Sequence, residues 1–148
     1  PYVFKYWDQA AEPNGNNCDA EFPAIRTAEM YLIVAEALNE INNAPTAEAT
    51  AALKVVRSRA KLKGTIPSDY AAFKAEVLKQ YRLEFVMEGH RWFDLKRMCT
   101  PEEFVSIIQE AKPDATPKAY HMLFPIPQRE INLSEGLITQ NPGYTNAQ

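Results

Sequence analysis

The sequence predicts an all-α protein built from helical hairpins, followed by an irregular, proline-rich C-terminal tail. Apolar residues recur every three or four positions across residues 23–111, which is the period of helices that bury one face. Five of the 11 prolines stand in the last 36 residues, where they block helix continuation. We therefore divide the chain into an irregular segment (1–22), a helical core (23–111) and an irregular tail (112–148).

Composition and charge exclude several classes of protein. The chain has 148 residues, 46% of them hydrophobic, which suits one globular domain. Its longest apolar run, residues 30–35, is far shorter than the roughly 20 residues of a membrane-spanning helix. The net charge of −3 gives no general attraction to nucleic acid or anionic lipid. The sequence begins with Pro1 and shows no signal peptide, so we expect the mature or excised part of a longer protein.

The cysteines and histidines form no metal or redox motif. Cys18 and Cys99 can form a disulfide in an oxidising compartment or remain two separate thiols. His90 and His121 are the two histidines, so a histidine-rich metal site is excluded. No cofactor is expected.

The first 22 residues are predicted to be irregular and acidic, with strong loop residues at 13–17. Tyr6 and Trp7 stand just before this Asn-rich loop. Sugar rings stack on such aromatics while Asn and Asp side chains bind hydroxyl groups. Tyr6 and Trp7 are therefore the candidate glycan-binding residues, although Trp7 can equally be buried by the C-terminal tail.

The first two predicted helices form a hairpin. An apolar stripe begins after Pro23 and continues to Leu38, and a polar break follows over residues 39–45. Thr46 is suited to cap the second helix, which Gly64 ends.

Three further helices are predicted. The third starts after residues 67–68 and carries an aromatic stripe as far as Gly89. The fourth covers residues 90–97, after a bend at the glycine. The fifth has Thr100 at its N-cap and Glu103 three residues later, and it runs to about Ala111. Paired helices with short breaks resemble the tetratricopeptide arrangement, although the internal repeat is weak.

In the tail, residues 120–124 are predicted to be extended and residues 128–132 to form a single turn. Pro125 and Pro127 make the intervening segment stiff. We expect this tail to wrap over the helical core.

The carboxylates of residues 84–94 allow two interpretations. Glu84, Glu88 and Arg91 share one helical face at spacings of four and three. Paired carboxylates could serve a hydrolase, but such pairs normally flank a cleft from separate elements. The spacing favours an ion-pair ladder in which Arg91 pairs with Glu88, Asp94 or both. No catalytic residue is predicted.

Two other groups favour structural roles. The basic residues Arg57, Arg59, Lys61 and Lys63 end a helix and are expected to be a solvated helix end rather than a phosphate site. Trp92 and Phe93 continue the apolar stripe and are expected in the core.

Four stretches together resemble the SusD/RagB family of nutrient-uptake outer-membrane lipoproteins. They are an Arg-x-Ala-Glu helix (residues 25–37), a Val-Arg-x-Arg-Ala helix (53–60), the stretch from Glu84 to Arg97, and Phe-Pro-Ile-Pro (124–127) followed by Glu130-Ile131 and Gln-Asn-Pro-Gly-Tyr (140–144). The chain departs from the family at Gln80-Tyr81, where Glu-Arg is usual, and at Ser134, where Asn is frequent.

The resemblance implies the C-terminal part of a helical, tetratricopeptide-like protein without catalytic activity. It implies a cell-surface protein, held in the outer membrane by an N-terminal lipid anchor absent from this chain. Such a protein captures an oligosaccharide, polysaccharide or other nutrient and sits on a TonB-dependent, SusC-like transporter.

A helical-repeat scaffold for a protein partner is the alternative function. A hydrolase that uses the carboxylates of residues 84–94 is the least favoured of the three candidate functions. Because the recognisable motifs suit helix packing, we expect this chain alone to bind glycan weakly or not at all.

Overall fold

A computed structural model of the chain describes residues 4–6, 8 and 21–145. Within these residues the fold is all-α, with six α-helices, two short 3₁₀ helices and no strand, as the sequence predicts. None of the described helices is long and apolar enough to cross a membrane.

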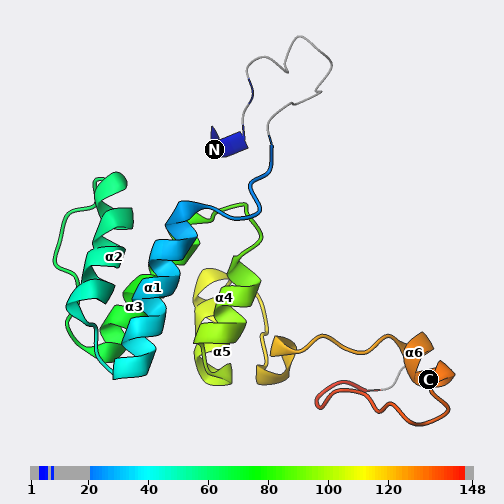
Figure 1. The fold of residues 1–148 in the computed structure, drawn as a ribbon. Helices are drawn as coiled ribbons and strands as arrows, with labels where there is room; N and C mark the ends of the chain where they lie inside the picture. Colours follow the sequence, from blue (N-terminus) through cyan, green and yellow to red (C-terminus); the bar gives the residue numbers. More distant parts are fainter. Residues whose placement is uncertain (1–3, 7, 9–20, 146–148) are drawn as a thin grey trace.

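The helical body consists of five helices (Figure 1). These are α1 (Thr27–Asn42), α2 (Ala47–Arg59), α3 (Tyr70–Glu84), α4 (Arg91–Met98) and α5 (Pro101–Ala111). Helix α1 packs against α2 and α3, and α3 packs against α4. The centre of the body is filled by fully buried Leu32, Leu53, Phe73 and Val77, with Tyr81 at its side. Each of the first three helices thus buries one apolar stripe, as its sequence period predicts.

The predicted caps of α2 and α5 are confirmed. The Thr46 hydroxyl accepts a hydrogen bond from the Ala49 amide at 3.1 Å. Thr100 and Glu103 form a capping box, in which each backbone amide donates to the other side chain. These bonds satisfy amide groups that a helix start leaves without a partner.

Helix α1 differs from its prediction because it crosses the expected polar break. It runs to Asn42, and Asn43 ends it in the left-handed conformation at φ 50°. Asn39 is fully buried and its side-chain amide donates to the Tyr70 carbonyl at 3.2 Å. Asn39 is therefore a buried polar residue that joins two helices. Its polarity alone suggests the end of the helix.

Helix α3 also ends earlier than predicted, at Glu84 rather than at Gly89. Met87 and Gly89 both adopt positive φ, at 65° and 79°, which a right-handed helix cannot accommodate. The resulting turn redirects the chain, so residues 84–88 and α4 lie on different elements.

The first part of the tail packs on the helical body, with residues 119–122 against α5 and Phe124 against Trp92, and the rest extends away from the body instead of wrapping over it (Figure 1). The tail contains a 3₁₀ helix (Ala119–Met122) where extended chain was predicted, and α6 (Gln128–Leu133) near the predicted turn. The tail folds back on itself, because the Gln140 side chain bonds both the amide and the carbonyl of Ile126, at 2.8 and 2.9 Å. The stiff segment around Pro125 is thereby held within the tail.

Candidate functional site

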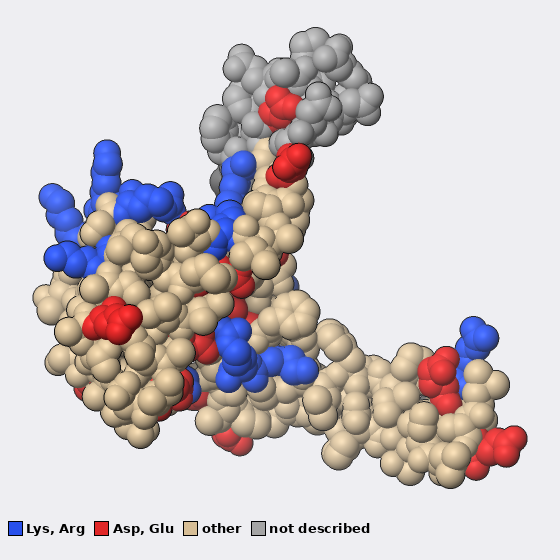
Figure 2. Space-filling model, in the orientation of Figure 1, with Lys and Arg blue, Asp and Glu red and all other residues tan. Residues whose placement is uncertain are grey.

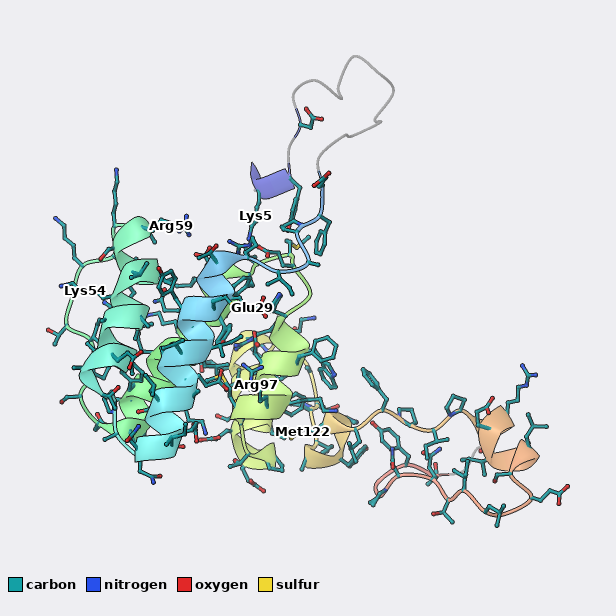
Figure 3. All side chains as sticks on the ribbon, in the orientation of Figure 1. Lys5, Glu29, Lys54, Arg59, Arg97 and Met122 are labelled. Atoms are coloured by element: carbon teal, nitrogen blue, oxygen red, sulfur yellow. The ribbon has the colours of Figure 1, made fainter. Side chains whose placement is uncertain are left out.

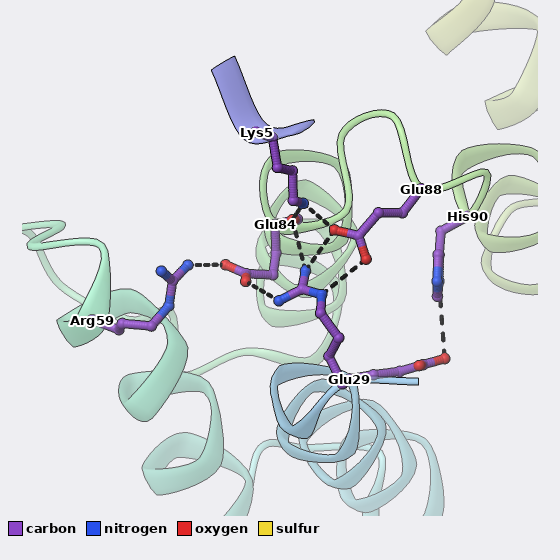
Figure 4. A network of polar contacts seen from close by, with 7 residues as sticks. Lys5, Glu29, Arg59, Glu84, Glu88 and His90 are labelled. Atoms are coloured by element: carbon purple, nitrogen blue, oxygen red, sulfur yellow. Dashed lines mark hydrogen bonds and ion pairs between the residues drawn. The ribbon is translucent and has the colours of Figure 1, made fainter. Parts of the chain in front are cut away.

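A network of charged side chains joins the N-terminal segment, α1 and the end of α3 (Figure 4). Arg26, just before α1, donates to Glu84 Oε1 at 2.9 Å and to both oxygens of Glu88 at 2.9 and 2.8 Å. Its guanidinium also donates to the Glu84 carbonyl at 3.0 Å. Lys5 adds an ion pair with Glu88, and Arg59 of α2 adds one with Glu84. Two neighbouring carboxylates are thus held by cations from three separate parts of the chain.

This network gives Glu84 and Glu88 a structural role. Burial acts to raise the pKa of each carboxyl group. Hydrogen bonds from Arg26 to both groups, from Arg59 to Glu84 and from Lys5 to Glu88 outweigh this effect. Both pKa values are therefore lower than that of a free glutamate. A general acid of a glycosidase needs a raised pKa. The pair therefore lacks the protonation state that the hydrolase interpretation requires.

The predicted role of Arg91 is wrong. Among the described residues Arg91 forms no ion pair, and its Nη1 is buried without a hydrogen-bond partner. Asp94 Oδ1 instead lies 3.4 Å from Nη1 of Arg97. The turn before α4 accounts for the missing pair with Glu88, because Glu88 lies before the turn and Arg91 lies within α4. Arg91 and Asp94 share α4, but there the Asp94 carboxylate pairs with Arg97.

The basic residues around the end of α2 divide into two kinds. Figure 2 shows Lys and Arg side chains gathered over this end of the molecule, as expected for a solvated helix end. Arg57, however, is buried and pairs with Glu76 at 3.5 Å. It also donates to the Gly64 and Thr65 carbonyls, at 3.3 and 3.4 Å. Arg57 therefore closes the loop after α2 rather than facing solvent.

Of the two candidate glycan-binding residues, Tyr6 lies within the described part of the chain. Its ring stacks on Phe22 with centroids 5.7 Å apart, and its hydroxyl is buried without a hydrogen-bond partner. Burial, with a smaller contribution from Glu88, raises the pKa of Tyr6. Trp7 and the loop at 13–17 lie outside the described residues. Glycan binding by Tyr6 and Trp7 stays a prediction.

The two neighbouring aromatics of α4 have different surroundings. The Trp92 ring packs edge-on against Phe104, with ring centroids 5.7 Å apart. It also packs at a tilt against Phe124 of the tail, with centroids 4.9 Å apart. Both contacts agree with a structural role. Phe93 is 68% exposed, so the prediction that it lies in the core is wrong. Consecutive residues point about 100° apart on a helix, and the buried positions of α4 are taken by Asp94, Leu95 and Met98.

Phe93 lies on a groove between α1 and α4 with a volume of about 640 Å³. Glu29 and Arg97, labelled in Figure 3, belong to its two sides. His90 stands at one end, where its ring stacks on Phe85 with centroids 4.4 Å apart. Sequence reasoning missed this groove. The signal available was the pair Trp92-Phe93, since adjacent residues point about 100° apart on a short helix and one of the two rings can face outward.

Asp94 and Tyr81 are buried polar side chains of the groove, each 2% exposed, and Glu88 is a third whose charge is matched by Arg26 and Lys5. Burial raises the pKa of Asp94 and of Tyr81. Asp94 Oδ2 has no hydrogen-bond partner, and the Tyr81 hydroxyl makes no hydrogen bond of normal geometry, although Glu36 lies close enough to add to the rise in its pKa. The groove is therefore lined by residues with buried polar atoms whose hydrogen-bonding capacity is unused.

The described residues contain no cluster of three or more His, Cys, Asp or Glu side chains that could hold a metal ion. Cys99 is a half-buried free thiol whose pKa is raised by burial. Cys18 lies outside the described residues.

Comparison with known proteins gives consistent matches. Residues 1–144 match the SusD family. SusD-like protein P2 of Formosa agariphila is 30% identical over 158 residues, covering 97% of this chain and 30% of that protein. The starch-binding protein SusD of Bacteroides thetaiotaomicron is 30% identical over 129 residues, covering 85% of this chain and 22% of that protein.

A solved structure agrees with these matches. The crystal structure of a SusD homolog from Bacteroides thetaiotaomicron superposes with a TM-score of 0.67 at 29% identity, covering 87% of this chain and 28% of the other. The chain thus spans less than a third of the length of the relatives cited here.

Proposed function

Because the chain belongs to the SusD family, we propose that it is part of a glycan-binding component of an outer-membrane uptake system. Proteins of this family are non-catalytic binding proteins. The observation that carries the proposal is the family match over residues 1–144, together with 30% identity to a starch-binding protein. The chain covers less than a third of that protein, so the activity is proposed for the whole protein to which these residues contribute.

The proposal includes a cell-surface location and a transporter partner. The full-length protein would be held in the outer membrane by an N-terminal lipid anchor and would sit on a SusC-like, TonB-dependent transporter. Helical hairpins provide broad side surfaces for such a contact. The helical body of α1–α5 supports this role.

The ion pairs at Glu84 and Glu88 support a binding role over hydrolysis. Both carboxylates are fixed by Arg26 and stay ionised at neutral pH. Tyr6 and Trp7 remain the proposed glycan contacts of the N-terminal segment. A helical-repeat scaffold for another protein partner accounts for the hairpins but not for the SusD relatives.

Gene disruption in the native host tests the proposed function. Loss of the protein should slow growth on one polysaccharide and leave growth on the corresponding monosaccharide unchanged. Surface proteolysis of intact cells should remove the protein. Unchanged growth on every polysaccharide tried, with the protein protected inside the cell, would contradict the proposal.

A further inference from the structure

We propose that the groove between α1 and α4 binds an amino sugar, a sugar unit that carries a free ammonium group. The inference rests on the proposed glycan-binding function and names the class of glycan. It begins from the size of the groove, about 640 Å³, which lies within the range of about 300–1,000 Å³ found for small-molecule sites. One or two sugar units suit this volume.

The lining of the groove is acidic. Five carboxylates contribute to it, those of Glu29, Glu36, Glu40, Glu88 and Asp94, together with one guanidinium, that of Arg97. An excess of one charge in a concave site attracts ligands of the opposite charge. The charge of the lining therefore favours a cationic ligand.

Lys or Arg side chains pair with four of these carboxylates, and three of the four have no buried oxygen that lacks a hydrogen-bond partner. Glu88 pairs with Arg26 and Lys5. Glu36 accepts two hydrogen bonds from Arg97, at 2.9 and 2.8 Å. Glu40 accepts a hydrogen bond from the Tyr70 hydroxyl at 2.7 Å and lies 3.3 Å from the Lys74 ammonium.

The other two carboxylates, Asp94 and Glu29, have unused oxygens. Asp94 Oδ2 is buried without a partner, and its Oδ1 has only the 3.4 Å contacts from Arg97, which lies closer to Glu36. Glu29 Oε2 is likewise buried without a partner, and its Oε1 lies 3.9 Å from His90 Nδ1. A buried acceptor without a donor is costly, and the cost is larger for a charged group. A ligand that brings donors to these oxygens recovers that energy.

An amino sugar supplies the chemistry that these groups lack. Its ammonium group carries three donors and the positive charge that the lining favours, while its hydroxyls can reach the Tyr81 hydroxyl and the second carboxylate. The exposed ring of Phe93 offers an apolar face to the sugar ring and a π face to the ammonium. A neutral sugar leaves the charge unmatched. A lysine side chain supplies the charge but no hydroxyls.

Nitrogen-15 NMR titration of the chain tests the proposal directly. The probes are glucosamine, N-acetylglucosamine, glucose and Nα-acetyl-lysine amide, the last standing for a basic peptide. We expect glucosamine to shift amide signals of α1 and α4, with a dissociation constant about tenfold lower than that of each other probe, as a charged hydrogen bond implies. Equal binding of glucose or N-acetylglucosamine would overturn the proposal. Lysine amide binding as tightly as glucosamine would overturn it in favour of a peptide site.

Two variants and a matched control locate the site. Asp94→Asn keeps the shape of the side chain and removes its charge, so glucosamine affinity should fall about tenfold. Phe93→Ala should weaken glucosamine binding while its melting temperature stays close to that of the parent chain. Phe124→Ala removes another aromatic ring, 67% exposed on the tail, and should leave glucosamine affinity unchanged. Glucosamine binding that survives both Asp94→Asn and Phe93→Ala would overturn the assignment to this groove.

The failure of this inference is distinguishable from failure of the proposed function. If neutral oligosaccharides bind and the groove variants do not affect them, the glycan-binding function stands and the amino-sugar site is wrong. If gene disruption leaves growth on polysaccharides unchanged, the uptake function is wrong, whatever the titration with glucosamine shows.

Discussion

Arg26 and Glu88, 62 positions apart in the sequence, form a bidentate ion pair. Nε of Arg26 donates to Glu88 Oε2 at 2.9 Å, and Nη2 donates to Oε1 at 2.8 Å. The Glu88 side chain is 1% exposed and that of Arg26 is 25% exposed. Since the guanidinium also stacks over the Phe85 ring at 4.6 Å, one arginine fixes the start of α1 against the end of α3.

Arg26→Ala should destabilise the chain by about 2–3 kcal/mol. The substitution leaves Glu84 and Glu88 as neighbouring, largely buried carboxylates without their shared cation. Urea unfolding followed by circular dichroism measures the change. Arg59→Ala is the matched control: Arg59 also pairs with Glu84 but is 65% exposed, so its removal should cost no more than about 1 kcal/mol. Equal losses in the two variants would contradict the central position of Arg26.

The same carboxylates predict loss of stability in acid. The pKa values of Glu84 and Glu88 are lower in the folded chain than the roughly 4.3 of an unfolded glutamate. Their contribution is therefore fully present above about pH 5 and is lost as the pH falls through the folded pKa values. The buried Asp94, whose pKa is raised, works in the opposite direction and offsets part of the loss.

Thermal melts from pH 7 to pH 3 measure this effect. We expect the melting temperature to fall by roughly 3 °C or more below pH 4.5, since about 1 kcal/mol corresponds to that shift in a chain of this size. Arg26→Ala should show a weaker dependence on pH. A melting temperature with the same pH dependence in the parent chain and in Arg26→Ala would contradict the lowered pKa values of the two glutamates.

Trp92→Ala should lower the free energy of unfolding much more than Phe93→Ala. Trp92 contacts Phe104 and Phe124, and loss of its half-buried ring should cost about 2–3 kcal/mol, below the range for a fully buried aromatic. Phe93 is mostly exposed, so its truncation should change the free energy of unfolding by less than about 0.5 kcal/mol. A larger loss for Phe93 than for Trp92 in chemical denaturation would refute this assignment.

Gly143→Ala should disrupt the tail without unfolding the helical body. Gly143 has φ 88°, and an added Cβ would lie 2.3 Å from Cγ of Tyr120, whose ring packs edge-on against Tyr144. Limited proteolysis should therefore cut the tail of this variant faster while α1–α5 resist. At Gly136, φ is 89° and no atom lies within 4 Å of an added Cβ, so Gly136→Ala shows the backbone effect alone. Identical cleavage of the two variants would argue against the Tyr120 contact.

Local sequence signals predicted the helical body well. Thr46 and Thr100 stand at the caps where the sequence places them, because capping depends on residues only three positions apart. The end of α1 could not be predicted in the same way, since buried Asn39 finds its partner at Tyr70, 31 positions away. The fold of the tail on itself depends on Gln140 bonding Ile126, 14 positions away, which the residues around the prolines do not encode.

The candidate site was harder to predict because its partners are distant in sequence. Spacing along one helix suggested Arg91 as the partner of Glu88, whereas the structure supplies Arg26 and Lys5 from the other end of the chain. The groove depends on the turn at residues 85–89, which turns Phe93 outward and brings Asp94 opposite α1. The sequence predicts a bend at Gly89, but helical periodicity contains no information on the direction of that turn.

The central claim is that the acidic groups divide into a structural pair, Glu84 and Glu88, and a ligand-binding group, Asp94. Carboxyl carbon-13 NMR, recorded during a pH titration with and without saturating glucosamine, tests it most directly. We predict that Glu84 and Glu88 titrate below the usual value of about 4.3 in both series, while Asp94 titrates above about 3.9 and moves to lower pKa when the ammonium group is bound. An Asp94 pKa that glucosamine leaves unchanged, or a raised pKa at Glu84 or Glu88, would contradict this account.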